Sequence, residues 1–357
     1  MSAVVNQGRS GSASTGQLII AGVGIAAVSQ MTAEVRSHIR CSDVVFYHAT
    51  SGVMAAYIRA LNPNLVDLYR YYGEAKIRRK TYIQMAELLL REVRKGRRVV
   101  AVFHGHPGFF VMAARRASAI AREEGYDVRL LPGVSSVDCM LADLSIDPGK
   151  FGLQIVKAGS YLRGKTELLT SGHVAFLQVD SVGDSTFSFT GYKHSRLAEF
   201  FGKLSDEYGE KQEIVYYVAP IFPGTDPSVT TKRVGQFRQP GNLSGLGAGI
   251  LYVPPRGDSY NSMLNRQAFE SGQVYGEFEL TAIEELDSHA IDTSFKSRQT
   301  SPAVLKAMEE LTDDVSMLAL YRKSPEVFLK RHPNLSRSEF EALRTRSDQA
   351  IRAMCNK

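Results

Sequence analysis

Two tyrosines and an arginine, Tyr72, Arg78 and Tyr82, are the side chains whose types and spacing could do chemistry in this chain. Arg78 and Tyr82 are four residues apart, so on a helix they share one face, and Tyr72 precedes them by one loop. A guanidinium within hydrogen-bonding reach lowers the pKa of a phenol, which is otherwise about 10. Such a trio could deprotonate a weak N–H acid or stabilise charge on an adjacent oxygen. The same spacing also fits an aromatic cluster with a solvated arginine, so it does not by itself establish an active site.

A second candidate site lies in residues 102–111. The strand-like run 99–103 ends at a turn containing Gly105 and Gly108, and a helix is predicted to follow at 109–124. Glycines at such a turn let the backbone approach a small molecule closely. The turn is too short for a phosphate loop and lacks that loop's lysine, so it indicates a different nucleotide-like ligand.

Other ligand patterns are incomplete. His104 and His106 flank a glycine, but no third ligand at useful spacing accompanies them, so we predict no metal site. Gly22 and Gly24 fit any close turn from a strand into a helix. The third glycine and the ribose-binding acid of a dinucleotide fingerprint are missing. We therefore expect His106 and the backbone after it to line a ligand pocket.

Composition narrows the function classes. The chain has 357 residues, 44% hydrophobic and 22% charged, which is ordinary for a globular protein. Its net charge of +6 is spread out, and the densest basic cluster, at 76–80, is short, so we predict no nucleic-acid partner. Three scattered cysteines, Cys41, Cys139 and Cys355, favour a reducing cytosol. No apolar run is long enough to span a bilayer, and the Ser/Gly-rich segment 1–16 is predicted to be disordered rather than a signal peptide.

The elements that must position these residues form two predicted α/β domains. In the first, 17–149, strand-like and helical runs alternate, which favours a mostly parallel sheet. Ser135 is expected to cap a helix whose third residue is Asp138. The predicted strands are 18–21, 44–47, 99–103 and 128–131, and the predicted helices are 32–39 and 82–93.

The second predicted domain, 150–255, mixes strands and helices in an α/β or α+β pattern. A cleft between two such domains is a common place for a ligand. The predicted strands are 173–179, 213–218 and 250–253, and the predicted helix is 195–208.

The rest of the chain, residues 256–357, no longer shows the α/β pattern. Residues 256–297 are polar and predict a wrapping linker, and 298–357 predict a helical module for dimerisation or partner docking. Ser336 and Glu339 have the spacing of a capping box, which predicts the start of the last helix. The predicted helices of this module are 302–312, 314–322, 325–331 and 337 to about 354, the last with an apolar stripe of Phe340, Leu343, Ala350, Ile351 and Met354.

Several motifs together resemble the tetrapyrrole-methylase superfamily. They are Gly22-Val-Gly24, Met31-Thr32, Asp43-Val-Val-Phe-Tyr47, Gly105-His-Pro-Gly108 and Pro132-Gly-Val-Ser135. The match is closer to one branch, the omphalotin-type borosin peptide α-N-methyltransferases. The runs similar to that branch are 68–72, 81–85, 91–96, 137–144, 146–148, 187–191 and, in the helical tail, 347–352. The resemblance implies a two-domain α/β tetrapyrrole-methylase-like fold with a C-terminal helical clasp, and S-adenosylmethionine bound between the domains.

The resemblance assigns roles to individual residues of this sequence, one matching position at a time. Tyr72, Arg78 and Tyr82 match the residues that assist amide deprotonation and stabilise the resulting imidate, with Tyr72 as base, Arg78 lowering its pKa and Tyr82 donating to the amide oxygen. His104 departs from the pattern, since the omphalotin-type enzyme has tyrosine there. The positions that match cofactor contacts are His104, His106, Phe109, Val111, Ser135, Ser136, Gln178, Ala219, Gly249 and Ile250.

The resemblance implies an enzyme that uses S-adenosylmethionine to methylate backbone amide nitrogens of a peptide, within a homodimer whose clasp embraces the partner subunit. Fused precursors of this branch end in an apolar core peptide. This chain ends at Lys357 without one, so the core has been removed or the substrate is a separate chain. Two alternatives remain: a methyltransferase for small tetrapyrroles, and a non-catalytic scaffold that binds peptide.

Overall fold

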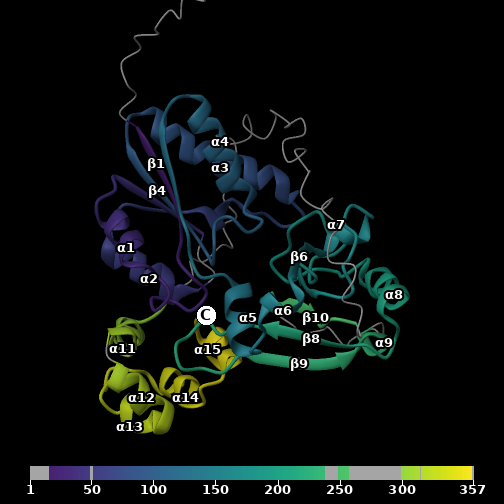
Figure 1. Cartoon of the computed structure of the whole chain (residues 1–357). Coiled ribbons are helices and arrows are strands. Elements are labelled where there is room, and N and C mark those ends of the chain that lie inside the picture. Colours follow the sequence, from purple (N-terminus) through teal and green to yellow (C-terminus); the bar gives the residue numbers. More distant parts are fainter. Residues whose placement is uncertain (1–15, 49–50, 238–247, 257–298, 314, 356–357) are drawn as a thin grey trace, which may run out of the picture.

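The computed structural model describes residues 16–48, 51–237, 248–256, 299–313 and 315–355. Figure 1 shows three parts: a first domain at the upper left, a second domain at the right and a C-terminal helical module at the lower left. Nearly all of the segments predicted to be disordered (1–16) and to be a linker (256–297) lie outside the described residues. Among the described residues, no helix has both the length and the apolar character that crossing a membrane requires.

The first domain contains a five-stranded sheet in the order β3-β2-β4-β1-β5. All of its strand pairs are parallel, which confirms the prediction made from the alternation of strands and helices. Only β3 was not predicted, because three residues are too few to show a period. The strands are β1 Gln17–Gly22, β2 Val44–His48, β3 Leu65–Asp67, β4 Arg98–Phe103 and β5 Asp127–Leu131.

Helices cover both faces of this sheet, because inward-facing strand residues alternate between two apolar clusters. One cluster packs against α1 and α2, and the other packs against α3 and α4. Helix α4 begins three residues later than predicted, because Phe110 has a left-handed backbone with φ of 56°. The helices are α1 Ala33–Arg40, α2 Gly52–Leu61, α3 Arg78–Arg94, α4 Met112–Glu123 and α5 Ser136–Asp143, with a 3₁₀ turn η1 at Leu68–Tyr71.

The second domain contains a mixed sheet in the order β6-β7-β10-β8-β9, in which only β6 and β7 pair in parallel. The predicted strands at 213–218 and 250–253 are confirmed. Strand β9 was not predicted, because most of its residues are polar. The elements are α6 Pro148–Phe151, β6 Leu153–Lys157, α7 Ala158–Leu162, β7 His173–Leu177, α8 Leu197–Tyr208, β8 Glu213–Val218, β9 Ser228–Arg233, α9 Val234–Phe237 and β10 Ile250–Val253.

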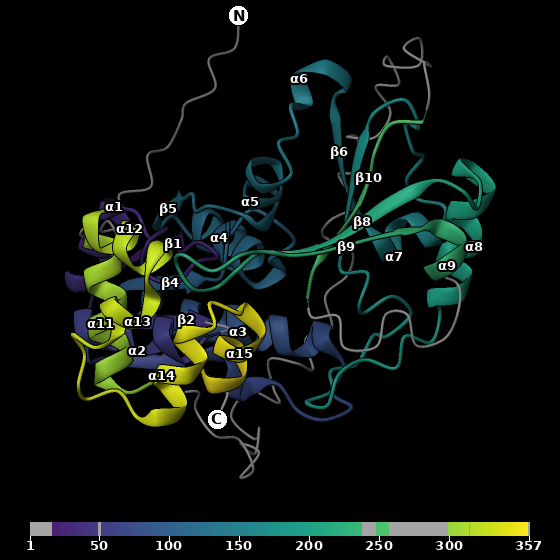
Figure 2. The ribbon, with the colours of Figure 1, turned by 90° about the horizontal axis from the view of Figure 1, so that it is seen from below.

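The C-terminal helical module consists of helices α11 to α15. Its apolar residues, among them Met308 and Tyr321, join the cluster that packs on the α1/α2 face of the first domain. Figure 2 shows these helices lying against that domain. The predicted capping box of Ser336 and Glu339 is confirmed. The helices are α11 Pro302–Asp313, α12 Val315–Lys323, α13 Pro325–Leu329, α14 Arg337–Arg344 and α15 Asp348–Cys355.

The prediction of one long helix from 337 to about 354 is wrong. The chain breaks after α14, where Arg346 has a left-handed backbone with φ of 52° and its side chain donates to the carbonyl of Arg322 at 2.7 Å. Leu343 and Ile351 are fully buried as expected, but they belong to separate helices. The apolar spacing continues across the break, and the sequence therefore hides it.

Candidate active site

Three glycines meet at the carboxyl edge of the first sheet, and we call them the glycine edge: Gly22 at the end of β1, Gly105 after β4 and Gly133 after β5. A Cβ atom on Gly22 would lie 2.4 Å from the carbonyl oxygen of Gly105 and 2.8 Å from the Cα atom of Gly133. Gly105 also needs a φ of 71°, which glycine adopts at no steric cost. A side chain at Gly22 or Gly133 would therefore collide with the backbone of the neighbouring loop. Loops at this edge are where open α/β sheets bind ligands.

The turn after Gly105 is held by its own side chains. The Nδ1 atom of His106 accepts a hydrogen bond from the Gly108 N–H at 2.9 Å, and the His106 ring meets that of Phe109 edge to face at 5.2 Å. Val111 is the N-terminal cap residue of α4 and packs on the apolar cluster below. His104, which is partly buried, comes directly after β4.

Ser135 and Ser136 form the start of α5, next to Gly133. The predicted cap is confirmed: the Oγ atom of Ser135 accepts from the Asp138 N–H at 3.2 Å, and the Asp138 carboxylate accepts from the Ser135 N–H at 2.7 Å. Ser135 is 3% exposed, so its hydroxyl supports the helix end.

Four predicted cofactor positions come together at one edge of the second sheet. Gln178 follows β7, Ala219 follows β8, Gly249 precedes β10 and Ile250 begins it. Because β10 lies between β7 and β8 and runs antiparallel to both, the ends of β7 and β8 meet the start of β10. A Cβ atom on Gly249 would lie 2.5 Å from the Tyr216 ring.

This edge packs against the first domain. One apolar cluster combines Ile25, Val137 and Met140 from the first domain with Ala219 and Ile250 from the second. A Cβ atom on Gly105 would lie 3.1 Å from the Cδ1 atom of Ile25 in the same cluster. The structure therefore brings the glycine edge and the second-domain positions to opposite sides of one interdomain contact.

Tyr72 and Tyr82 lie together in the apolar cluster on the α3/α4 face of the first sheet, which also includes Phe187 of the second domain. Their rings meet edge to face at 6.3 Å, and Tyr72 also stacks on Phe187 of the second domain at 4.3 Å. Tyr72 is only 7% exposed. Burial, followed by the charge of Tyr82 and a hydrogen bond with its hydroxyl, raises the pKa of Tyr72 well above its usual value.

Arg78 begins α3 and reaches into the second domain. Its Nη1 atom lies 3.3 Å from the Tyr192 hydroxyl, its guanidinium lies 5.0 Å from the centre of the Tyr192 ring, and its Nη2 atom donates to the Asp184 carbonyl. The backbone before it pairs with residues 185–187: Ala75 N–H donates to the Phe187 carbonyl at 2.9 Å and Arg78 N–H to the Ser185 carbonyl at 3.1 Å. This pairing joins the two domains at the site.

The sequence predicts that Arg78 lowers the pKa of Tyr72, whereas in the structure burial, followed by Tyr82, raises that pKa well above its usual value. Arg78 instead opposes the effect of burial on Tyr192, whose pKa is nevertheless raised. Burial likewise raises the pKa of Asp180, with Arg78 and His194 acting against it. Tyr192 and Asp180 were not predicted, because they approach Arg78 from another domain and share no sequence spacing with it. We call Tyr72, Arg78, Tyr82 and Tyr192 the tyrosine cluster.

Within the part of the chain that the structure describes, no group of three or more His, Cys, Asp and Glu side chains is placed to hold a metal ion. The absence of a metal stays a prediction.

Comparisons with known proteins agree with this architecture. Residues 17–219 match the family model of the Tetrapyrrole (Corrin/Porphyrin) Methylases, and residues 274–357 match the Borosin biosynthesis clasp domain. A curated relative from Dendrothele bispora, "Methyltransferase/ribosomally synthesized cyclic peptide dendrothelin A precursor", is 36% identical over 94% of this chain and 87% of its own length. The corresponding omphalotin A precursor from Omphalotus olearius is 35% identical over 94% of this chain and 87% of its own length.

These matches confirm the predicted family, the α/β fold with its C-terminal helical module, and an enzyme that transfers a methyl group. Identity above one third over nearly the whole chain covers both domains and the module. The chain belongs to the tetrapyrrole methylase family, in the branch of borosin methyltransferases.

Proposed function

We propose that this protein transfers methyl groups from S-adenosylmethionine to backbone amide nitrogens of a peptide. The observation that carries the proposal is the tyrosine cluster, in which phenols and a guanidinium from both domains meet. Its Tyr72 ring contacts His48, which contacts Phe103 at the end of β4, the strand partner of Gly22. These groups suit an acceptor that must lose a proton and spread negative charge onto oxygen.

The glycine edge fits the methyl donor. Gly22, Gly105 and Gly133 let the chain ends of β1, β4 and β5 pack closely, which brings backbone groups together at the carboxyl edge, where open α/β sheets bind ligands. When bound, S-adenosylmethionine supplies an electrophilic methyl carbon on a positively charged sulfur. The residues proposed to hold it are His104, His106, Phe109, Val111, Ser135, Ser136, Gln178, Ala219, Gly249 and Ile250.

The tyrosine cluster would prepare the acceptor. An amide nitrogen is a weak nucleophile because its lone pair is delocalised into the carbonyl group. In our proposal the Tyr72 oxygen, once ionised, takes the amide proton, so the N–H bond breaks and an O–H bond forms. Its raised pKa makes this phenolate a stronger base but a rarer one. The Tyr82 hydroxyl and the charged Arg78 stabilise the negative charge that moves to the carbonyl oxygen.

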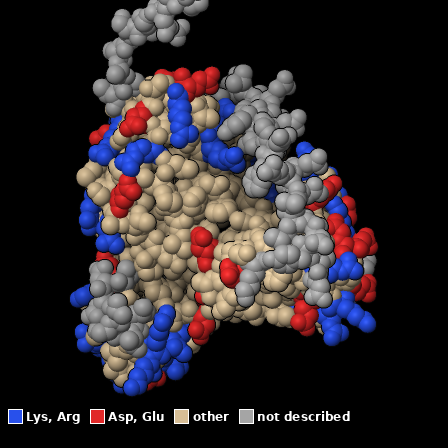
Figure 3. All heavy atoms as spheres, in the orientation of Figure 1, with Lys and Arg blue, Asp and Glu red and all other residues tan. Residues whose placement is uncertain are grey.

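A peptide acceptor is supported by the relatives, whose names describe methyltransferases joined to cyclic peptide precursors. In Figure 3 most charged side chains lie around the rim of the viewed face, with a few acidic ones near its middle. The proposed substrate is an apolar core peptide, fused or separate. We also propose a homodimer in a reducing cytosol, where Cys41 and Cys139 stay as free thiols.

Mass spectrometry tests the activity. The full chain is incubated with S-adenosylmethionine and an apolar peptide, either joined to its C-terminus or added separately. We expect mass gains in whole CH₂ steps, with fragment ions placing each gain on a backbone nitrogen. The control is the same mixture with S-adenosylhomocysteine, which has no methyl group to give.

Gains confined to side chains, or no gain although the donor binds, would contradict the proposal. A tetrapyrrole added in place of the peptide tests the small-molecule alternative. Sedimentation of the same sample tests the dimer, which a mass of one chain would exclude.

A further inference from the structure

The connection between β8 and β9, residues 219–227, leaves the second sheet and contacts the C-terminal helical module. Figure 2 shows it reaching across to the helices of that module. Two side chains of α15 hold its backbone: the Arg352 Nη2 atom donates to the Ala219 carbonyl at 2.7 Å, and the Asp348 Oδ1 atom accepts from the Ile221 N–H at 2.8 Å. The module thus binds the carbonyl of Ala219 and the N–H of Ile221.

These two side chains also hold each other. Arg352 donates to the second carboxylate oxygen of Asp348, one helical turn earlier. Asp348 is 7% exposed, so its carboxylate oxygens are held by these partners. The break after α14 matters here, because it makes Asp348 the first residue of α15 and aims its carboxylate at the connection.

The far side of the same connection faces the proposed donor site. Ala219 packs in the interdomain cluster with Ile25, which adjoins Gly105 of the glycine edge. The Ile221 carbonyl accepts from the Ala27 N–H at 2.9 Å, in the turn that follows Gly22 and Gly24. Phe222 packs with Tyr321 of the module in the α1/α2 cluster. The connection therefore lies between the donor-side loops and α15.

We propose that Arg352 and Asp348 are positioning residues, which fix Ala219 and thereby make the affinity for the methyl donor depend on the docking of α15. This inference rests on the proposed function, because it takes Ala219 as part of the donor site. The Ala219 carbonyl and the Ile221 N–H are close together along the backbone. Charge-assisted hydrogen bonds to both of them leave the connection little freedom to move. The module would then act on the enzyme's own cofactor site in addition to any role with the peptide.

Calorimetry of S-adenosylmethionine binding to the full chain tests the proposal. Arg352→Met removes the donor to Ala219 and keeps the length of the side chain. We expect binding about tenfold weaker, as for the loss of a charge-assisted hydrogen bond. Arg331→Met is the matched control, because Arg331 pairs with Glu310 at 3.0 Å in the same module but away from the connection. We expect it to change the affinity less than about twofold.

Two further variants separate positioning from a general loosening. Asp348→Asn keeps an acceptor for the Ile221 N–H but weakens the pair with Arg352, so its effect should be smaller than that of Arg352→Met. The double variant should lose less than the sum of the two single losses, because the residues act together. Equal losses in Arg352→Met and Arg331→Met, or none in Arg352→Met, would overturn the proposal.

Hydrogen exchange of the Ile221 amide gives a readout independent of the donor. We expect faster exchange in Arg352→Met than in Arg331→Met, and unchanged exchange would refute the positioning role. If the wild-type chain shows this protection but binds no S-adenosylmethionine, the proposed function fails while the structural contact stands.

Discussion

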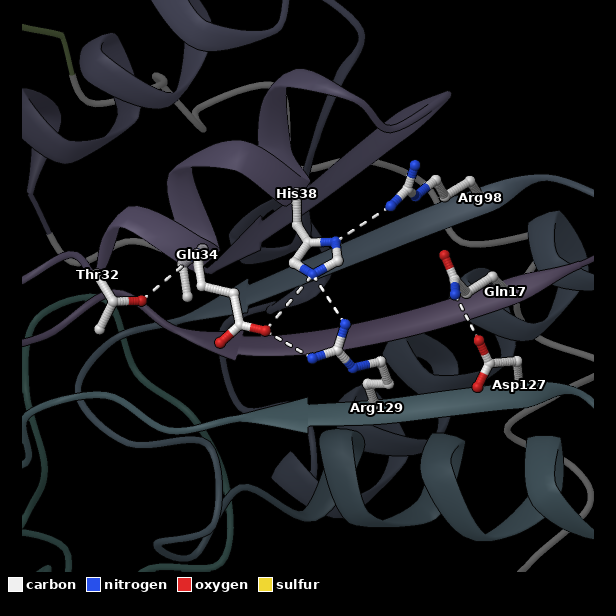
Figure 4. Close-up of polar contacts among 8 residues, drawn as sticks. Gln17, Thr32, Glu34, His38, Arg98, Asp127 and Arg129 are labelled. Atoms are coloured by element: carbon white, nitrogen blue, oxygen red, sulfur yellow. Dashed lines mark hydrogen bonds and ion pairs between the residues drawn. The ribbon is translucent and has the colours of Figure 1, made fainter.

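The two edges of the first sheet are built in opposite ways. At the amino edge, charged and polar side chains pair with one another: Gln17 donates to Asp127 at 2.5 Å, and the His38 ring lies between Arg98 and Arg129, each 3.3 Å away. Figure 4 shows this network, which Glu34 completes by accepting from Arg129. At the carboxyl edge, glycines remove side chains where the strands end.

The difference teaches where function is to be sought. Polar groups that satisfy each other, as around His38, stabilise a fold and leave little for a ligand. The carboxyl-edge side of the first domain offers backbone groups, a guanidinium, and phenols whose pKa values are raised by burial. Shifted pKa values of this kind are typical of an active site. Residues rich in chemistry by type are thus structural at one edge, while at the other edge we propose that glycines serve the ligand.

The largest expected effect comes from the tyrosine cluster. Arg78→Ala removes the positive charge beside the acceptor and should lower the methylation rate by about a hundredfold or more, with donor binding retained. Tyr72→Phe should abolish methylation in the same way. Single-turnover assays by mass spectrometry measure the rate, and Arg79→Ala, at the adjacent exposed position, is the control. Wild-type rates in Arg78→Ala or Tyr72→Phe would show that this cluster is aromatic packing.

The glycine edge should be intolerant of even one methyl group. Gly22→Ala places a Cβ atom against the Gly105 carbonyl and should lower the free energy of unfolding by about 1–3 kcal/mol, together with donor affinity. Urea denaturation and calorimetry measure the two. Gly202→Ala is the control, since a Cβ atom there meets nothing within 4 Å in helix α8, and it should stabilise by up to about 1 kcal/mol. Equal stability of both variants would remove the contrast between the edges.

Tyr192→Phe sharpens the assignment within the cluster. It deletes the hydroxyl next to Arg78 while keeping the ring under the guanidinium. We expect the rate to fall about tenfold, through a less fixed Arg78 rather than a lost charge. Donor affinity should not change. A loss as large as that of Arg78→Ala would make Tyr192 itself the group that handles the proton.

The amino edge should respond to acid instead. Burial, followed by Arg129 and Arg98, lowers the pKa of His38, while Glu34 raises it. The unfolded chain therefore binds a proton more readily, so stability is full above about pH 6.5 and is lost as the pH falls below it. His38→Gln should flatten this part of the denaturation profile and leave donor affinity unchanged. A profile as steep as that of the wild type would assign the acid response to other groups.

Local patterns predicted much of this molecule. The parallel sheet, strands β8 and β10, and the caps at Ser135 and Ser336 are confirmed. The strands and the caps depend on residues within a few positions of one another, and the parallel sheet was predicted from the alternation of such local elements along the chain. The break after α14, by contrast, was hidden, because the apolar spacing persists while Arg346 turns the chain to satisfy a carbonyl in another helix.

The candidate site also has features that local sequence predicts and features that depend on long-range contacts. The sequence by itself determined that Tyr72, Arg78, Tyr82 and the glycine turns were candidates, since residue type and short spacing are visible in one dimension. Only the tertiary structure decided that Arg78 faces Tyr192 and that burial raises the pKa of Tyr72. Burial and long-range pairing depend on which segments fold against each other, and a pKa shift follows from that environment rather than from neighbours along the chain.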